Sequence, residues 1–291
     1  MHLVLSRIEP KDLDAVVPIL FKSFHKIDLA NVFFGRESPA SYAYAKRQLL
    51  EGMQKDPADV FLKIEDLDAE ADVNVLDDKG NTVRTERRKR IVCVSNWKIY
   101  PTYVTPQELQ QQQHEHEHGQ GGQRAPTDNK PDYGDGDGDG RGLGSKLELK
   151  AKKAAAEPAF SYLETEQERS DAATLMEDFL SRRRRECREA HVLCFLLFTD
   201  PDYQGKGCGR MMMQWGNDVA DALMLPCWIE ASPEGELLYL QMGYLGRERV
   251  RIQTKSFLGE YLHMRRPLMV ERVRLEGRTL VREPAGGSLS N

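Results

Sequence analysis

A glycine-rich turn lies between a buried strand and a helix in residues 191–223, and this arrangement constrains the fold more than any other part of the chain. Residues 191–199, HVLCFLLFT, are nearly all apolar and are followed by Asp200, Pro201 and Asp202, which is typical of a central strand buried on both faces. Apolar residues then recur at helical spacing over residues 211–223. The sequence QGKGCG, residues 204–209, therefore lies at the first turn of a helix, and we call it the glycine turn.

The glycine turn predicts an anion site. The first turn of a helix exposes main-chain N–H groups without intrahelical partners, and the helix dipole favours a negative charge there. Gly205, Gly207 and Gly209 allow a close backbone approach and unusual dihedral angles. A Walker A loop is excluded because neither Lys-Ser nor Lys-Thr follows the glycines, and a dinucleotide fingerprint is excluded because Met212 stands where its third glycine would be.

Composition favours one globular core with insertions. The chain has 291 residues, 40% of them hydrophobic, and a formal net charge of -5, which argues against a general nucleic-acid binder. It has no run of eighteen apolar residues and no secretory signal at its start, so we expect neither membrane insertion nor secretion. Five cysteines without CxxC spacing indicate reduced thiols and a cytoplasmic protein. The basic run 182–185 leaves nuclear entry open, although we favour a solvated helix end.

The pattern along the chain divides it into four segments. Residues 1–104 carry a strand at 3–8, a helix with Asp12 as N-cap, a loop from Phe33 to Pro39, a helix at 40–53 and an elongated hairpin built on 60–64 and 90–97. Residues 105–145 have almost no apolar side chains and predict a disordered insert. Residues 146–270 form a second half in which Leu175, Met176, Phe179 and Leu180 make a helical stripe. Residues 271–291 are expected to be a tail.

Two tracts in the insert have compositions that occur at metal sites. His114 to His118 read HEHEH, and aspartate and glycine alternate over residues 134–140. A helix-loop-helix calcium site needs a closing glutamate and apolar flanking helices, whereas Arg141 follows the alternation. We interpret both tracts as low-complexity sequence and expect no metal.

The glycine turn and the sequence after it resemble the GNAT acetyltransferase superfamily. The pyrophosphate motif of that superfamily, [QR]xxGx[GA], is matched by Gln204, Gly207 and Gly209. Residues 195–244 are also similar to filamentous-fungal members, with blocks written HPxYQxxGxG, ADxxGLP, LEAS and GxxLYxxxGF. The chain departs from these blocks at Thr199, Asp200, Ile229 and Tyr244. The resemblance implies an α/β (α+β) fold, in which a mixed central sheet is splayed at the acetyl-CoA site and flanked by helices.

The resemblance also implies which residues bind acetyl-CoA. The pantetheine arm would lie along Leu197, Phe198 and Thr199, and the amide of Leu197 would polarise the thioester carbonyl. Gln204 would open the turn. The pyrophosphate would be held by the amides of Gly205, Lys206, Gly207, Cys208, Gly209 and Arg210.

Two residues are candidates for the chemistry. Tyr239 stands where related enzymes place the acid that protonates the CoA thiolate, although a buried core tyrosine or a hydrogen bond to the sulfur would also fit. Glu230 is a candidate general base, although burial would have to raise its pKa toward neutrality for that role. A hydrogen-bonded structural carboxylate is the interpretation that we favour. His191 is a further candidate for the base, and Trp97 and Tyr100 are expected in the acceptor pocket or the core.

The sequence therefore predicts an acetyl-CoA-dependent N-acetyltransferase with an unidentified amine acceptor, bound near residues 22–39 and 247–267. The alternative is a non-catalytic acyl-CoA-binding or interaction protein, and a second rival makes the histidine and aspartate tracts a metal-buffering module. Neither a nucleic-acid nor a membrane partner is expected, and the oligomeric state stays open.

Overall fold

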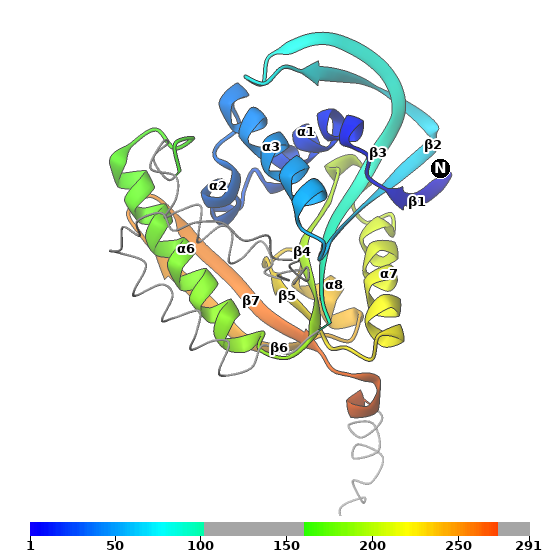
Figure 1. Cartoon of the computed structure of the whole chain (residues 1–291), viewed down its shortest axis with the longest axis vertical. Coiled ribbons are helices and arrows are strands. Elements are labelled where there is room, and N and C mark those ends of the chain that lie inside the picture. Colours follow the sequence, from blue (N-terminus) through cyan, green and yellow to red (C-terminus); the bar gives the residue numbers. More distant parts are fainter. Residues whose placement is uncertain (102–159, 273–291) are drawn as a thin grey trace, which may run out of the picture.

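The computed structural model describes residues 1–101 and 160–272. Among these residues, seven strands form one sheet in the order β1-β2-β3-β4-β5-β7-β6 (Figure 1). Its strands are β1 (Leu3–Arg7), β2 (Asp59–Leu76), β3 (Thr82–Tyr100), β4 (His191–Thr199), β5 (Cys227–Ala231), β6 (Leu245–Gln253) and β7 (Leu258–Arg266). The β4–β5 pair is parallel and the other described pairs are antiparallel, which confirms the predicted mixed sheet.

Helices cover both faces of the sheet. The described α-helices are α1 (Leu13–Phe24), α2 (Asp28–Phe34), α3 (Pro39–Lys55), α6 (Glu166–Glu186), α7 (Cys208–Ala222) and α8 (Glu236–Gln241). Neighbouring strand residues point to opposite faces, so Phe61 packs with α1 and α3 while Leu62 packs with α7. The sheet is therefore the middle layer, with α1, α2, α3 and α6 on one face and α7 and α8 on the other.

The hairpin of β2 and β3 is longer than the strands beside it, at 18 and 19 residues. Figure 1 shows it arching over α1 and α3. Near its tip, the Asp14 carboxylate accepts hydrogen bonds from the Leu76 amide at 3.1 Å and from Lys46 Nζ at 2.6 Å. The predicted elongated hairpin is confirmed, and its far end is held by the helices.

The helix starts follow from local hydrogen bonds. Ser38 caps α3 by accepting from the Ser41 amide, and Thr165 and Glu168 form a capping box at the start of α6. Asp12 occupies the N-cap position of α1, as predicted, but its side chain makes no capping hydrogen bond to the helix. Its carboxylate instead accepts from the Glu9 amide at 2.8 Å and pairs with Lys63 at 2.9 Å, so it closes the turn before α1.

Two further predictions need correction. The predicted loop from Phe33 to Pro39 begins with the last turn of α2, because Val32 and Phe34 are buried. The basic run 182–185 is not a uniformly solvated helix end, because Arg183 is turned into the core. Arg183 follows Phe179 by four residues, which places both on the apolar stripe of α6.

The predicted insert, both metal-like tracts and most of the predicted tail lie outside the described residues. In residues 1–101 and 160–272 there is no cluster of three or more candidate metal ligands. None of the helices in these ranges has the length and apolar character needed to cross a bilayer.

Candidate functional site

The parallel strands β4 and β5 separate shortly after they begin. They pair at Val192, Leu193 and Cys194 of β4, opposite residues 227–229 of β5. Beyond Cys194, β4 continues along β3 alone, and a register shift leaves Phe195 as an extra residue. This β-bulge bends β4 away from β5. The predicted splay of the sheet is therefore present, and it opens an unpaired edge of β4.

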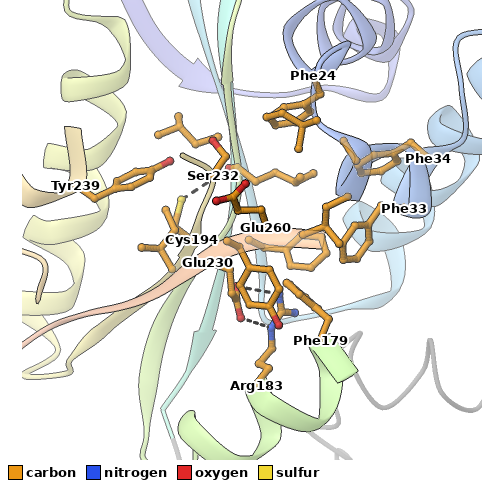
Figure 2. A pocket seen from close by; sticks show the side chains of 18 residues that line it. Phe24, Phe33, Phe34, Phe179, Arg183, Cys194, Glu230, Ser232, Tyr239 and Glu260 are labelled. Atoms are coloured by element: carbon orange, nitrogen blue, oxygen red, sulfur yellow. Dashed lines mark hydrogen bonds and ion pairs between the residues drawn. The ribbon is translucent and has the colours of Figure 1, made fainter. Parts of the chain in front are cut away.

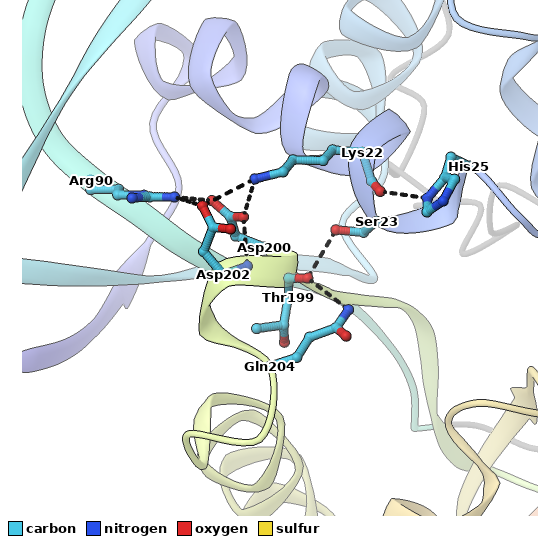
Figure 3. Close-up of polar contacts among 8 residues, drawn as sticks. All are labelled: Lys22, Ser23, His25, Arg90, Thr199, Asp200, Asp202 and Gln204. Atoms are coloured by element: carbon cyan, nitrogen blue, oxygen red, sulfur yellow. Dashed lines mark hydrogen bonds and ion pairs between the residues drawn. The ribbon is translucent and has the colours of Figure 1, made fainter.

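The main-chain groups of Leu197 point into this opening. The Asp200 amide donates to the Val92 carbonyl of β3 at 2.9 Å, and N–H directions alternate along an antiparallel strand. The N–H groups of Leu197 and Thr199 therefore lie on the edge that faces away from β3. On that edge the Thr199 carbonyl accepts from Ser23 Oγ at 3.0 Å and from Gln204 Nε2 at 3.4 Å (Figure 3).

The glycine turn follows β4 after one turn of 3-10 helix (Pro201–Tyr203), and its last two residues are the first two of α7. Gly205 and Gly207 have φ of +72° and +90°, which L side chains rarely adopt. Glycine is favoured at position 209 for a different reason, because a Cβ there would lie 3.0 Å from Leu238 Cδ2. Five amides of this segment have no main-chain partner among the described residues, and they belong to Gly205, Gly207, Cys208, Gly209 and Arg210. The Lys206 amide makes one long bond, 3.4 Å, to the Tyr203 carbonyl.

An ion cluster anchors the start of the turn. The Asp200 carboxylate accepts from Lys22 Nζ at 2.7 Å and from Arg90 at 2.9 Å, and both cations also contact Asp202 (Figure 3). Burial opposes ionisation of Asp200, but its hydrogen bonds with Lys22 and Arg90 prevail and hold its pKa below the ordinary value. The charges of the two carboxylates and the two cations cancel. The cluster therefore adds no net negative charge that would repel an anion from the unpaired amides of the turn.

Tyr239 points from α8 into the opening between the strands (Figure 2). Its side chain is 6% exposed. Gly235 leaves room for the ring, because a Cβ there would be 2.8 Å from Tyr239 Cε2. Burial, followed by the nearby Cys194, raises the pKa of the Tyr239 phenol, so the hydroxyl keeps its proton near neutral pH.

A pocket of about 100 Å³ lies where β4 and β5 separate, and we call it the central pocket. Its walls come from α1, α2, α6, α8 and three strands. Most of the side chains are apolar. The lining residues are Phe24, Ile27, Leu29, Ala30, Phe33, Phe34, Phe179, Arg183, Cys194, Phe195, Leu196, Leu197, Ile229, Glu230, Ser232, Tyr239, Glu260 and Tyr261.

Glu230 lies in the pocket wall and is paired with Arg183. The guanidinium donates to both carboxylate oxygens, at 2.7 and 2.9 Å. Arg183 also lies over the rings of Phe179 and Phe195, at 4.6 and 5.2 Å from their centroids. The two bonds hold the Glu230 carboxylate in a fixed position in the pocket wall.

The other sequence candidates lie away from the central pocket. His191 is at the opposite end of β4 from the glycine turn, where its ring contacts Tyr100, and burial lowers its pKa. Trp97 is in the core against α7, and a Cβ on Gly216 would be 2.1 Å from its ring.

The structure identifies individual pocket residues inside the two ranges, 22–39 and 247–267, that the resemblance implied for the acceptor. Glu260 of β7 and the phenylalanines of α2 line the central pocket. Glu260 had one sequence signal, since it is an isolated charge in the apolar run LGEYLHM, but this pattern does not say which cavity the residue faces.

The fold is that of GNAT N-acetyltransferases. Arylalkylamine N-acetyltransferase 2 from Aedes aegypti superposes with a TM-score of 0.50 at 12% identity, over 91% of this chain and 98% of that chain. A Drosophila melanogaster polyamine N-acetyltransferase gives 0.47 at 10% identity, over 90% and 97% of the two chains. A Corynebacterium glutamicum structure described as histone acetyltransferase HPA2 and related acetyltransferase gives 0.45 at 13%, over 92% and 97%. No protein-family model and no curated protein sequence matches the chain. At these identities the likeness concerns the fold alone, and the fungal resemblance stays a prediction.

Proposed function

We propose that this chain is an acetyl-CoA-dependent N-acetyltransferase. One observation carries the proposal: the open edge of β4 leads from Tyr239 and the central pocket directly to the unpaired amides of the glycine turn. An extended ligand with an anionic end and a reactive end fits such a continuous track. The five cysteines are free thiols, which supports the cytoplasmic location that we also propose.

Acetyl-CoA would bind as a co-substrate along this track. The pantetheine arm would pair with the open edge at Leu197, Phe198 and Thr199, in the manner of an added strand. Gln204 holds the Thr199 carbonyl where the strand becomes the turn. The pyrophosphate would accept hydrogen bonds from the amides of residues 205–210, at the positive end of α7.

The proposed reaction is a direct attack of an amine on the thioester carbonyl. The N–H of Leu197 faces the opening and would stabilise the negative charge that develops on the carbonyl oxygen. Tyr239 would donate a proton to the departing thiolate of CoA. Its raised pKa keeps the phenol protonated until that step.

Glu230 is the general base that we propose for testing. It lines the central pocket, but both of its oxygens are bonded to Arg183. This pairing is the observation that favours the alternative of a non-catalytic acyl-CoA-binding protein, because such a protein needs no base. Acetyl-CoA hydrolysis or transfer, measured as release of free thiol with a panel of amines, separates the two functions.

A pair of glycine substitutions tests coenzyme binding. Gly207 and Gly243 both have positive φ, +90° and +85°, and open space where a Cβ would be. Gly207→Val and Gly243→Val should therefore destabilise the free protein similarly, by roughly 1 kcal/mol. Acetyl-CoA at about 100 times its Kd should stabilise the wild type by about 2.7 kcal/mol, or roughly 5 to 10 °C in Tm for a domain of this size.

We expect Gly243→Val to keep this acetyl-CoA-induced shift and Gly207→Val to lose it, because only the valine at Gly207 would cover the amides. Differential scanning fluorimetry with and without acetyl-CoA measures both. An unchanged shift in Gly207→Val would refute the assignment of the glycine turn to the pyrophosphate.

A further inference from the structure

The central pocket contains one acidic side chain that forms no ion pair with any described residue. Three charged residues line the pocket, namely Arg183, Glu230 and Glu260. The first two are paired with each other. Glu260 makes no hydrogen bond or ion pair with any described residue, although it is half-buried. Figure 2 shows its carboxylate in the middle of the pocket, between Tyr239 on one side and the phenylalanines of α2 on the other.

The basic residues nearest to Glu260 on the neighbouring strand do not satisfy it. Arg251 lies opposite Glu260 in the β6–β7 register, but it makes no ion pair with Glu260. Arg249 is paired with Glu236 of α8 at 2.7 Å. This pairing, with a smaller contribution from the charge of Glu260, raises the pKa of Arg249, so Glu260 interacts with Arg249 without a direct contact. A carboxylate left half-buried without a partner is costly, so a cationic ligand would gain a strong contact there.

Aromatic rings form the other side of the pocket. Phe24, Phe33 and Phe34 come from the first two helices, and Phe179 and Phe195 come from α6 and β4. Phe33 contacts Phe179 and Phe195 edge to face, with centroids 5.3 and 6.4 Å apart. A volume of about 100 Å³ suits a group no larger than one ring, since a cavity of about 150 Å³ holds benzene.

We propose that the acceptor is a monoamine whose ammonium group is held by Glu260 and whose apolar body, one aromatic ring or a branched alkyl group, lies among these phenylalanines. This inference rests on the proposed function. A polyamine would bring a second cation into the pocket, and Glu230, the other acidic lining residue, is already paired with Arg183. A peptide amine would place polar main-chain groups against a wall that is mostly apolar.

The test compares amines of different shape and charge. We expect 2-phenylethylamine and 3-methylbutylamine to be acetylated with a kcat/KM at least 10-fold higher than spermidine or a short peptide with a free N-terminus. The opposite order would overturn the inference and leave the proposed function intact. Absence of acetylation of every amine, together with no thermal shift on adding acetyl-CoA, would instead refute the proposed function.

Glu260→Gln tests the role of the carboxylate. Its KM for 2-phenylethylamine should rise about 10- to 100-fold, the range expected for a lost charge-assisted contact, while the KM for acetyl-CoA stays within twofold. Glu260→Asp should restore part of the affinity. Glu234→Gln is the matched control, because Glu234 is exposed and outside the pocket.

Two outcomes would overturn the role of Glu260. One is a KM for the amine that does not change in Glu260→Gln. The other is an equal loss in Arg251→Gln, which would indicate a structural pairing across the strands. Calorimetric titration of 2-phenylethylamine into the wild type and Glu260→Gln gives a readout without turnover: binding to the wild type should be at least 10-fold tighter, and no binding to the wild type would contradict the inference.

Discussion

The glycine turn and the central pocket are adjacent but are built in opposite ways. The turn offers main-chain N–H groups from one continuous stretch, residues 205–210, which includes the start of α7. The central pocket offers side chains from both halves of the chain, brought together by the splay of β4 and β5. A substitution in the turn acts through backbone conformation and through the Cβ it adds. A substitution in the pocket acts through the chemistry of the side chain it removes.

The two regions also use carboxylate–cation contacts at different depths. In the pocket wall, the side chains of Arg183 and Glu230 are 14% and 6% exposed. At the turn, Asp200 is buried but its partner Lys22 is 48% exposed. Because solvent screens exposed charges, we expect the pocket pair to dominate stability and the turn cluster to contribute less.

The largest effect is expected for Arg183→Leu. The substitution leaves Glu230 as an uncompensated buried charge, so it should lower the free energy of unfolding by about 3 to 5 kcal/mol. Arg185→Leu is the matched control, because Arg185 is 50% exposed in its pair with Glu248 and should cost at most about 1 kcal/mol. Urea denaturation measures both. An equal loss of unfolding free energy in the two variants would contradict the proposed difference between the buried and the exposed ion pair.

A smaller effect, on rate alone, is expected for Tyr239→Phe. Loss of a general acid should lower kcat by about 100-fold, while acetyl-CoA binding should persist because the amides of the glycine turn are untouched. Tyr244→Phe is the control, since the Tyr244 hydroxyl is bonded to Asn217 and Cys227 in the core. Steady-state kinetics and calorimetry measure the two quantities. A normal rate in Tyr239→Phe would assign the proton donor elsewhere.

The smallest effect is expected at Asp200 and depends on pH. Its pKa is lowered in the folded protein, so its ionised form stabilises the fold above the ordinary value of 3.8, and this contribution is lost as pH falls through the lower folded value. At pH 7 the free energy of unfolding of the wild type should exceed that of Asp200→Asn by roughly 1 kcal/mol.

Urea denaturation of both proteins at pH 7, 5, 4 and 3 measures this difference. It should stay constant from pH 7 to 5 and shrink below about pH 4, because Asn does not titrate. A difference that persisted at pH 3 would assign the effect to hydrogen-bond geometry instead of charge.

The sequence predicted the conformation of the turn well because the strand, the glycines and the helix that form it are contiguous. The apolar run 191–199, the glycines and the helical spacing after Met211 are contiguous, and they form β4, the turn and α7. The central pocket could not be predicted in this way. Glu260 and Phe33 are more than 200 residues apart in the chain, and the β4 bulge that opens the pocket has no glycine or proline to mark it.

The prediction for the basic run 182–185 was wrong because it relied on composition and not on the helical period. The run 182–185 contains four arginines, and its composition predicted a solvated end, whereas the helical period places Arg183 on the buried stripe with Phe179. Asp200 departs from the family pattern, and the structure gives it a defined position among Lys22, Arg90 and Asp202.

The ion cluster at Asp200 affects how a mutational screen of this protein would be interpreted. Lys22 on α1 and Arg90 on β3 precede the glycine turn by more than 100 residues, yet both fix the backbone from which it starts. Variants at either position should therefore emerge from a selection for weakened coenzyme affinity although neither side chain belongs to the proposed ligand set. If these variants were interpreted from the sequence alone, residues in the N-terminal half of the chain would be wrongly assigned to the coenzyme-binding site.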